Sequence, residues 1–196
     1  IAERRSEYVC VAATHTVMAC REDPDLQRAV LGSSMTVPDG MPIVWALRLL
    51  GKPLPDRVYG PGLMLKTCEH AAAAGHSIFL YGGRDEAALS RLIGALKERY
   101  PDLQIAGTYK PEYRQLTATE QAKVADHING SGADIVWVGL GVPRQELWMH
   151  QMRSQLDAPV LVGVGAAFDL NAGTVKQFGA VPQDFGLNDH GQCPGL

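Results

Sequence analysis

The 196-residue sequence predicts a single α/β domain in which helices cover both faces of a mostly parallel sheet. Short apolar runs alternate with longer segments of helical periodicity, and this alternation is typical of βαβ units. The 46% of apolar residues, against 20% charged, are enough for one well-filled core. Because strands buried on both faces are continuously apolar, these runs indicate a Rossmann-like parallel sheet.

In the first part of the chain, Tyr8–Ala13 is a continuous apolar run and predicts a buried strand. Asp23 and Pro24 open a helix, with aspartate as the N-cap and proline in the first turn. Ser34–Val37 predicts a short strand that ends at a Pro-Asp-Gly turn. Met41–Leu50 is apolar almost all round, so a buried helix is expected there.

The alternation becomes regular after residue 60. The helix expected at Glu86–Tyr100 places leucine or isoleucine at positions 89, 92, 93 and 96, one face of a helix. Thr117 and Glu120 form a capping box before the next helix. The expected helices are Gly60–Ala74, Glu86–Tyr100, Gln121–Asn129 and Arg144–Leu156, and the expected strands are Ser77–Tyr81, Leu103–Gly107, Asp134–Leu140 and Val160–Val164.

Composition excludes several classes of protein. The formal charge is only −3, which argues against a nucleic-acid partner, and no apolar run approaches the ~18 residues of a membrane span. The cysteines form no C-x-x-C pair, so we expect three buried thiols and one tail thiol in a reducing, cytoplasmic compartment. Residues 8–177 are expected to form the core, and residues 178–196, which contain no lysine or arginine, an irregular tail.

Candidate site residues follow the expected strands, because ligands of open parallel sheets bind at the carboxyl ends of the strands. Asp39 ends one strand and precedes an apolar helix, so its carboxylate is a candidate general base for an incoming hydroxyl. Candidate ligand contacts at other strand ends are Thr14, His15, Gly82, Gly83 and Gly141.

Other chemistries lack their motifs. The sequence contains no P-loop, no G-x-S-x-G elbow, and no histidines or cysteines at metal-ligand spacing, so no metal is expected. Two G-x-G strings, at Gly139 and Gly163, follow strands but lack the third glycine of a dinucleotide-binding loop. A nicotinamide-dependent Rossmann oxidoreductase therefore remains a weaker alternative.

Four separate motifs, in order and at matching spacing, resemble the WecG/TagA/CpsF family of glycosyltransferases. The resemblance extends from about Val9 to Lys176. The motifs are Thr36-Val-Pro-Asp39-Gly-Met-Pro-Ile-Val-Trp-Ala-Leu, Pro53-Leu-Pro-Asp-Arg57-Val-Tyr-Gly-Pro, Gly139-Leu-Gly-Val-Pro-Arg-Gln145-Glu146-Leu-Trp148 and Gly163-Val-Gly-Ala-Ala-Phe-Asp169-Leu-Asn-Ala-Gly173.

The resemblance implies an inverting transfer of N-acetylmannosamine, its uronic acid or a related hexose from a UDP-sugar to an undecaprenyl-diphosphate-linked acceptor. It places the catalytic aspartate at Asp39 and pocket residues at Arg57 and Gln145, with Glu146 beside them. The UDP-sugar is a substrate, and no cofactor is expected. The implied location is the cytoplasm, peripheral to the inner face of the cell membrane, in cell-envelope or exopolysaccharide assembly.

The sequence also departs from the family pattern. The threonine and asparagine of a T-x-N-A motif fall on Val11 and Ala13, so we expect Thr14 or His15 to replace them. The family pattern leads us to expect a basic amphipathic appendage after Gln177, and the sequence there contains no basic residue, as a truncation or a frame shift would explain. The strand and helix that usually precede Tyr8 in the family are also expected to be absent. Without the appendage the sequence argues against membrane docking, and the uncovered surface favours a homo-oligomer. The alternative function is an incompetent core that only binds the UDP-sugar.

Overall fold

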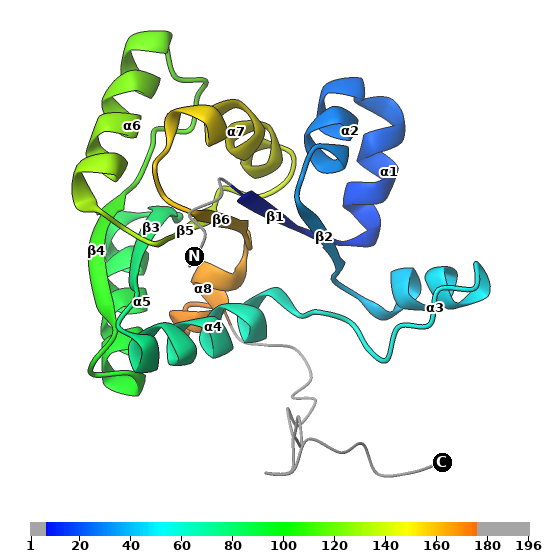
Figure 1. The fold of residues 1–196 in the computed structure, drawn as a ribbon, viewed down its shortest axis with the longest axis horizontal. Helices are drawn as coiled ribbons and strands as arrows, with labels where there is room; N and C mark the ends of the chain where they lie inside the picture. Colours follow the sequence, from blue (N-terminus) through cyan, green and yellow to red (C-terminus); the bar gives the residue numbers. More distant parts are fainter. Residues whose placement is uncertain (1–6, 176–196) are drawn as a thin grey trace.

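The computed structural model describes residues 7–175, which form a six-stranded parallel sheet with helices on both faces (Figure 1). The strand order is β2-β1-β6-β5-β3-β4. This arrangement confirms the predicted fold class, whereas the predicted tail at 178–196 lies outside the described residues. The strands are β1 (Glu7–Ala12), β2 (Met35–Pro38), β3 (Ser77–Gly82), β4 (Gln104–Tyr109), β5 (Ile135–Gly139) and β6 (Val160–Gly163).

The two faces of the sheet carry separate apolar layers. Along β3, Phe79 and Tyr81 enter one layer while Ile78 and Leu80 enter the other, as the two-residue period of a strand requires. Helices α6 and α7 pack on the first layer, and α4, α5 and α8 on the second. The helices are α1 (Thr14–Glu22), α2 (Pro24–Leu31), α3 (Met41–Leu49), α4 (Gly60–Ala74), α5 (Glu86–Arg99), α6 (Ala118–Ser131), α7 (Arg144–Met152) and α8 (Ala167–Asn171), with a 3₁₀ turn at Arg153–Gln155.

Most predicted elements are confirmed, but three predictions are wrong. Helix α1 was not predicted, because the segment Thr14–Glu22 buries only Thr16 and so shows little apolar periodicity. Cys20 on α1 is only half-buried, although a buried thiol was expected. Helix α3 forms as predicted, but of its residues only Val44 is buried. Its position beyond the edge strand β2, rather than over the sheet, leaves it uncovered (Figure 1).

The connections between strands progress in opposite directions across the sheet on the two sides of the β3–β5 pair. From β3 the chain continues through α5 to the edge strand β4, whereas from β5 it continues through α7 to β6 on the opposite side. The two connecting helices lie on opposite faces, which opens a crevice at the carboxyl ends of β3 and β5. In open α/β sheets such a switch point is where ligands bind.

Gly82 allows β3 and β5 to meet closely at this crevice. Its φ is +122°, and a Cβ added there would lie 2.5 Å from the carbonyl oxygen of Gly139. Only glycine fits both the backbone conformation and the space. The predicted glycine-rich strand end therefore shapes the floor of the crevice.

Candidate functional site

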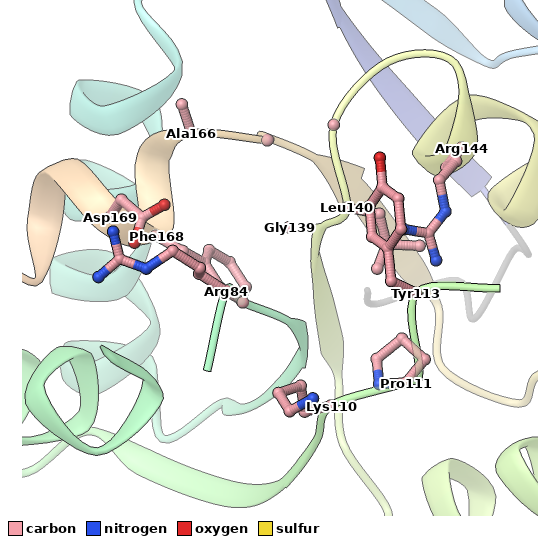
Figure 2. Close-up of a pocket in the computed structure, with 13 residues that line it drawn as sticks. Arg84, Lys110, Pro111, Tyr113, Gly139, Leu140, Arg144, Ala166, Phe168 and Asp169 are labelled. Carbon is pink, nitrogen blue, oxygen red and sulfur yellow. The ribbon is translucent and has the colours of Figure 1, made fainter. Parts of the chain in front are cut away.

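A cavity of about 330 Å³ lies at the switch point (Figure 2). The turns after β3, β4, β5 and β6 all contribute to it, which explains how residues far apart in sequence meet there. Its lining includes Gly83, Arg84, Lys110, Pro111, Tyr113, Gly139, Leu140, Gly141, Arg144, Gly165, Ala166, Phe168 and Asp169.

The cavity carries an excess of positive charge. Its lining contains three cationic side chains, Arg84, Lys110 and Arg144, and one carboxylate, Asp169. The Arg144 guanidinium lies 4.3 Å from the centre of the Tyr113 ring and donates to the Glu112 carbonyl at 3.3 Å. Figure 2 shows Arg84 and Asp169 on one side of the cavity and Tyr113 with Arg144 on the other. Such a lining suits an anionic ligand that also has hydroxyl groups.

Asp39 lies at the carboxyl end of β2, on the other side of β1. Its backbone N–H donates to the Ala12 carbonyl at 2.8 Å, which continues the β1–β2 ladder by one residue. The Val58 N–H donates to the Pro38 carbonyl at 2.8 Å, and this bond holds the Arg57 segment beside Asp39. Tertiary backbone bonds therefore bring together two residues from separate motifs.

The Asp39 carboxyl is half-buried, and its surroundings tune its acidity. Burial raises its pKa above the usual value, and the charges of Arg57 and His15 oppose that rise. A carboxylate whose pKa is raised toward neutrality is a better proton acceptor than an exposed one. The predicted general base thus has a suitable environment, with one cation from the loop after α3 and one histidine from α1.

Gln145 and Glu146 lie at the start of α7 and are both buried, with 2% and 0% of their surfaces exposed. Gln145 Nε2 donates to Glu146 Oε1 at 2.8 Å. The remaining oxygens, Gln145 Oε1 and Glu146 Oε2, have no hydrogen-bond partner in the described part of the chain. Gln145 lies under the turn at Gly165, which also lines the cavity. Glu146 therefore sets the orientation of the predicted pocket glutamine.

The predicted site residues fall into two groups. Gly83 and Gly141 line the cavity, and Gln145 lies beneath it, whereas Gly82 is buried in β3 and is absent from the lining. Asp39, Arg57 and His15 cluster near the β2 end, and Thr14, the first residue of α1, is exposed.

Three cavity cations were missed as site residues. Arg84 directly follows the glycine turn of β3, and Arg144 begins the helix three residues after Gly141 at the end of β5, so position after a strand end was an available signal. Lys110 was missed because β4 was expected to end at Gly107, whereas it continues to Tyr109. Tyr109 stacks on Tyr81, with 5.9 Å between ring centres, and this pairing lengthens the strand.

Replacing Glu146 with glutamine is expected to reduce the pH dependence of stability. Burial raises the pKa of the Glu146 carboxyl in the folded protein. A glutamate in the unfolded chain ionises at lower pH, so the contribution of the protonated Glu146 to stability is fully present below pH 4.5 and is lost as pH rises through the raised pKa. Glutamine cannot ionise, so the variant lacks this loss of stability. The loss amounts to about 1.4 kcal/mol of unfolding free energy for each pH unit by which folding raises the pKa. Urea denaturation at a series of pH values measures it.

The exposed Glu98 on α5 provides the matched control, since Glu98→Gln should retain the wild-type pH dependence. Identical curves for Glu146→Gln and the wild type would show that Glu146 is not the buried titrating group.

Among residues 7–175 no cluster of three histidine, cysteine, aspartate or glutamate side chains is arranged to hold a metal ion.

Residues 1–190 match the model of the glycosyl transferase WecG/TagA/CpsF family. The chain belongs to this family. Within the family, the chain is 29% identical over 175 residues to a protein of Bacillus spizizenii, and 30% identical over 159 and 145 residues to proteins of Bacillus subtilis and Staphylococcus aureus strain NCTC 8325. All three relatives are named N-acetylglucosaminyldiphosphoundecaprenol N-acetyl-beta-D-mannosaminyltransferase.

The matches cover 89%, 81% and 74% of this WecG/TagA/CpsF chain, but only 66%, 60% and 55% of the relatives' own lengths. A third or more of each relative's own length therefore lies outside the matched portion.

Proposed function

We propose that this chain is the core of an inverting glycosyltransferase. It moves N-acetylmannosamine, its uronic acid or a related hexose from a UDP-sugar to an undecaprenyl-diphosphate-linked acceptor at the cytoplasmic membrane face. The observation that carries the proposal is the placement of a half-buried Asp39, beside Arg57 and His15, along the same sheet edge as a cationic cavity. The names of the three relatives support the sugar and the lipid-linked acceptor.

The cavity is proposed to hold the nucleoside diphosphate of the donor. Arg84, Lys110 and Arg144 supply cationic donors for the two phosphates, and Asp169 supplies acceptors for ribose hydroxyls. Strands β2 and β5 are three strand spacings apart, or roughly 14 Å. An extended donor lying along the carboxyl edge therefore directs its sugar toward Asp39.

The proposed reaction is a single displacement. The Asp39 carboxylate accepts the proton of the acceptor hydroxyl, whose oxygen forms a bond to the anomeric carbon of the donor. The bond from that carbon to the phosphate oxygen breaks, and its electron pair leaves with UDP. Arg57 and the cavity cations stabilise the departing diphosphate, because they are already oriented before charge develops. Attack opposite to the leaving group inverts the configuration.

The decisive experiment combines binding with turnover. UDP and UDP-N-acetylmannosamine are titrated into the chain by calorimetry, and transfer to N-acetylglucosaminyl-diphosphoundecaprenol is followed with a radiolabelled donor. Binding together with transfer supports the proposal. Binding without transfer supports the alternative of a core that only binds the donor. Tight binding of NADH without binding of UDP overturns the proposal in favour of an oxidoreductase.

Replacing Arg144 with alanine is expected to weaken UDP binding about ten- to hundredfold, because a charge-assisted bond to a phosphate is lost. Arg28 on α2, an exposed arginine that lies outside the cavity lining, provides the matched control. Calorimetry with UDP alone measures both variants. Equal UDP affinities of Arg144→Ala and Arg28→Ala would show that UDP does not bind in this cavity.

A further inference from the structure

Helix α3 exposes an apolar face to solvent. Trp45, Leu49 and Leu50 expose 59%, 90% and 75% of their surfaces, and Pro42 and Ala46 between them are exposed too. At 100° per residue Pro42, Trp45, Ala46 and Leu49 share one side of the helix, opposite the buried Val44, and Leu50 directly follows the last turn. Single exposed apolar residues are ordinary, but a continuous apolar helix face indicates a binding surface. We call it the α3 face.

The charges on α3 and on the loop that follows it are positive. Residues 40–55 contain Arg48 and Lys52, and the carboxylates of Asp39 and Asp56 lie just outside this segment, at its two ends. Arg48 donates to the carbonyls of Leu54 and Pro55 at 2.8 and 2.6 Å, so it also fixes the loop that leads from α3 toward Arg57. An exposed tryptophan, leucines and flanking cations are the composition of helices that lie in the interface of an anionic bilayer.

The position of α3 relates the face to the candidate site. Helix α3 begins two residues after Asp39, and Figure 1 shows it extending beyond β2, away from the layers that cover the sheet. Among residues 7–175 no helix is long and apolar enough to cross a membrane. A helix of this length, about 13 Å, suits contact with one leaflet surface rather than passage through it.

We propose that the α3 face docks on the lipid bilayer that carries the polyprenyl-diphosphate acceptor. The inference rests on the proposed function, which places the acceptor's diphosphate at the membrane surface. Docking by α3 brings Asp39 to the level of the lipid headgroups, where the acceptor hydroxyl is presented. Membrane docking was not expected from the sequence, because a basic appendage is missing and Met41–Leu50 was predicted to be a buried helix.

Tryptophan fluorescence provides a direct test with the full chain. Of the three tryptophans, Trp137 and Trp148 are buried, so Trp45 is the one that responds to a change of solvent. Vesicles made of equal parts of phosphatidylglycerol and phosphatidylethanolamine should shift its emission to shorter wavelength and protect it from acrylamide. Co-sedimentation should be stronger with these vesicles than with phosphatidylcholine vesicles. The absence of both shift and sedimentation overturns the proposal.

The double variant Trp45→Ser/Leu49→Ser should lower vesicle affinity at least tenfold, an order of magnitude estimated from the loss of two buried apolar side chains. Leu49→Glu is a single-site second variant. Leu31→Ser, on the exposed end of α2, is the matched control and should bind as the wild type does. Wild-type vesicle binding by the double variant refutes the proposal. If the same variant instead converts a dimer to monomers in light scattering, the α3 face is an interface between copies of this chain.

Two readouts separate this proposal from the proposed function. UDP titration and transfer to a water-soluble, short-chain acceptor should be unchanged in the double variant, while transfer to the acceptor in vesicles falls. Failure of UDP binding in the wild type contradicts the proposed function alone, since vesicle binding is measured without nucleotide. Equal loss of transfer to soluble and vesicle-borne acceptors contradicts membrane docking alone.

Discussion

Replacing Asp39 with asparagine is expected to slow sugar transfer about 10²- to 10⁴-fold while the protein remains folded. Asparagine has nearly the same shape but cannot accept the proton of the acceptor hydroxyl. In the wild type, transfer should fall as the pH decreases through the Asp39 pKa, because only the carboxylate acts as a base. Burial raises that pKa, so the acid limb should lie above the ordinary aspartate range.

Initial rates with a labelled donor at a series of pH values measure both effects. Asp102→Asn, at an exposed turn before β4, is the matched control and should keep the wild-type rate and pH profile. UDP affinity should change little in Asp39→Asn, because the cavity proposed to hold the nucleotide lies on the far side of β1. Near-normal turnover by Asp39→Asn would falsify its role as the base.

Replacing Gly82 with alanine is expected to lower the free energy of unfolding by roughly 2–6 kcal/mol, the sum of a strained backbone and an overpacked contact. The φ of +122° disfavours any side chain, and the new Cβ would meet the carbonyl oxygen of Gly139 at 2.5 Å. The atoms nearest to the new Cβ are all backbone atoms of Gly139 in the inner strand β5, so they have little room to move. Urea denaturation monitored by circular dichroism measures the loss.

Gly94 on α5 provides the control for this substitution. A Cβ at Gly94 meets nothing within 4 Å, and the residue is exposed inside a helix. Gly94→Ala should therefore stabilise the protein by about 0.5–1 kcal/mol through helix propensity. If Gly82→Ala proves as stable as the wild type, the close contact between β3 and β5 at the switch point is wrong.

Local sequence patterns were enough to predict the buried strands of the sheet. The runs at β3, β5 and β6 are apolar on both faces, as is typical of a parallel sheet covered on both sides. The capping box at Thr117 was equally visible, since the reciprocal bonds of Thr117 and Glu120 involve neighbours in sequence. In contrast, α1 was missed because its single buried residue leaves no period to detect.

The candidate site was predicted only in part, for a related reason. Asp39, Arg57 and Gln145 lie within recognisable motifs, so a resemblance was enough to single them out. Lys110 lies in no pattern that separates a ligand-binding cation from a surface one, and Arg144 lies inside a motif that singled out its neighbour Gln145 instead. They become site residues only because the turns after β4 and β5 converge on one cavity.

Local periodicity and residue identity were enough to predict the fold class, the strand ends that carry chemistry and the family motifs. The tertiary structure decided which of these ends meet and which apolar residues are covered. Gln145 and Glu146 became a buried hydrogen-bonded pair, and Met41–Leu49, apolar enough for a core, became an exposed helix beyond the edge of the sheet. Burial depends on which elements pack against a segment, and no property of the segment alone contains that information.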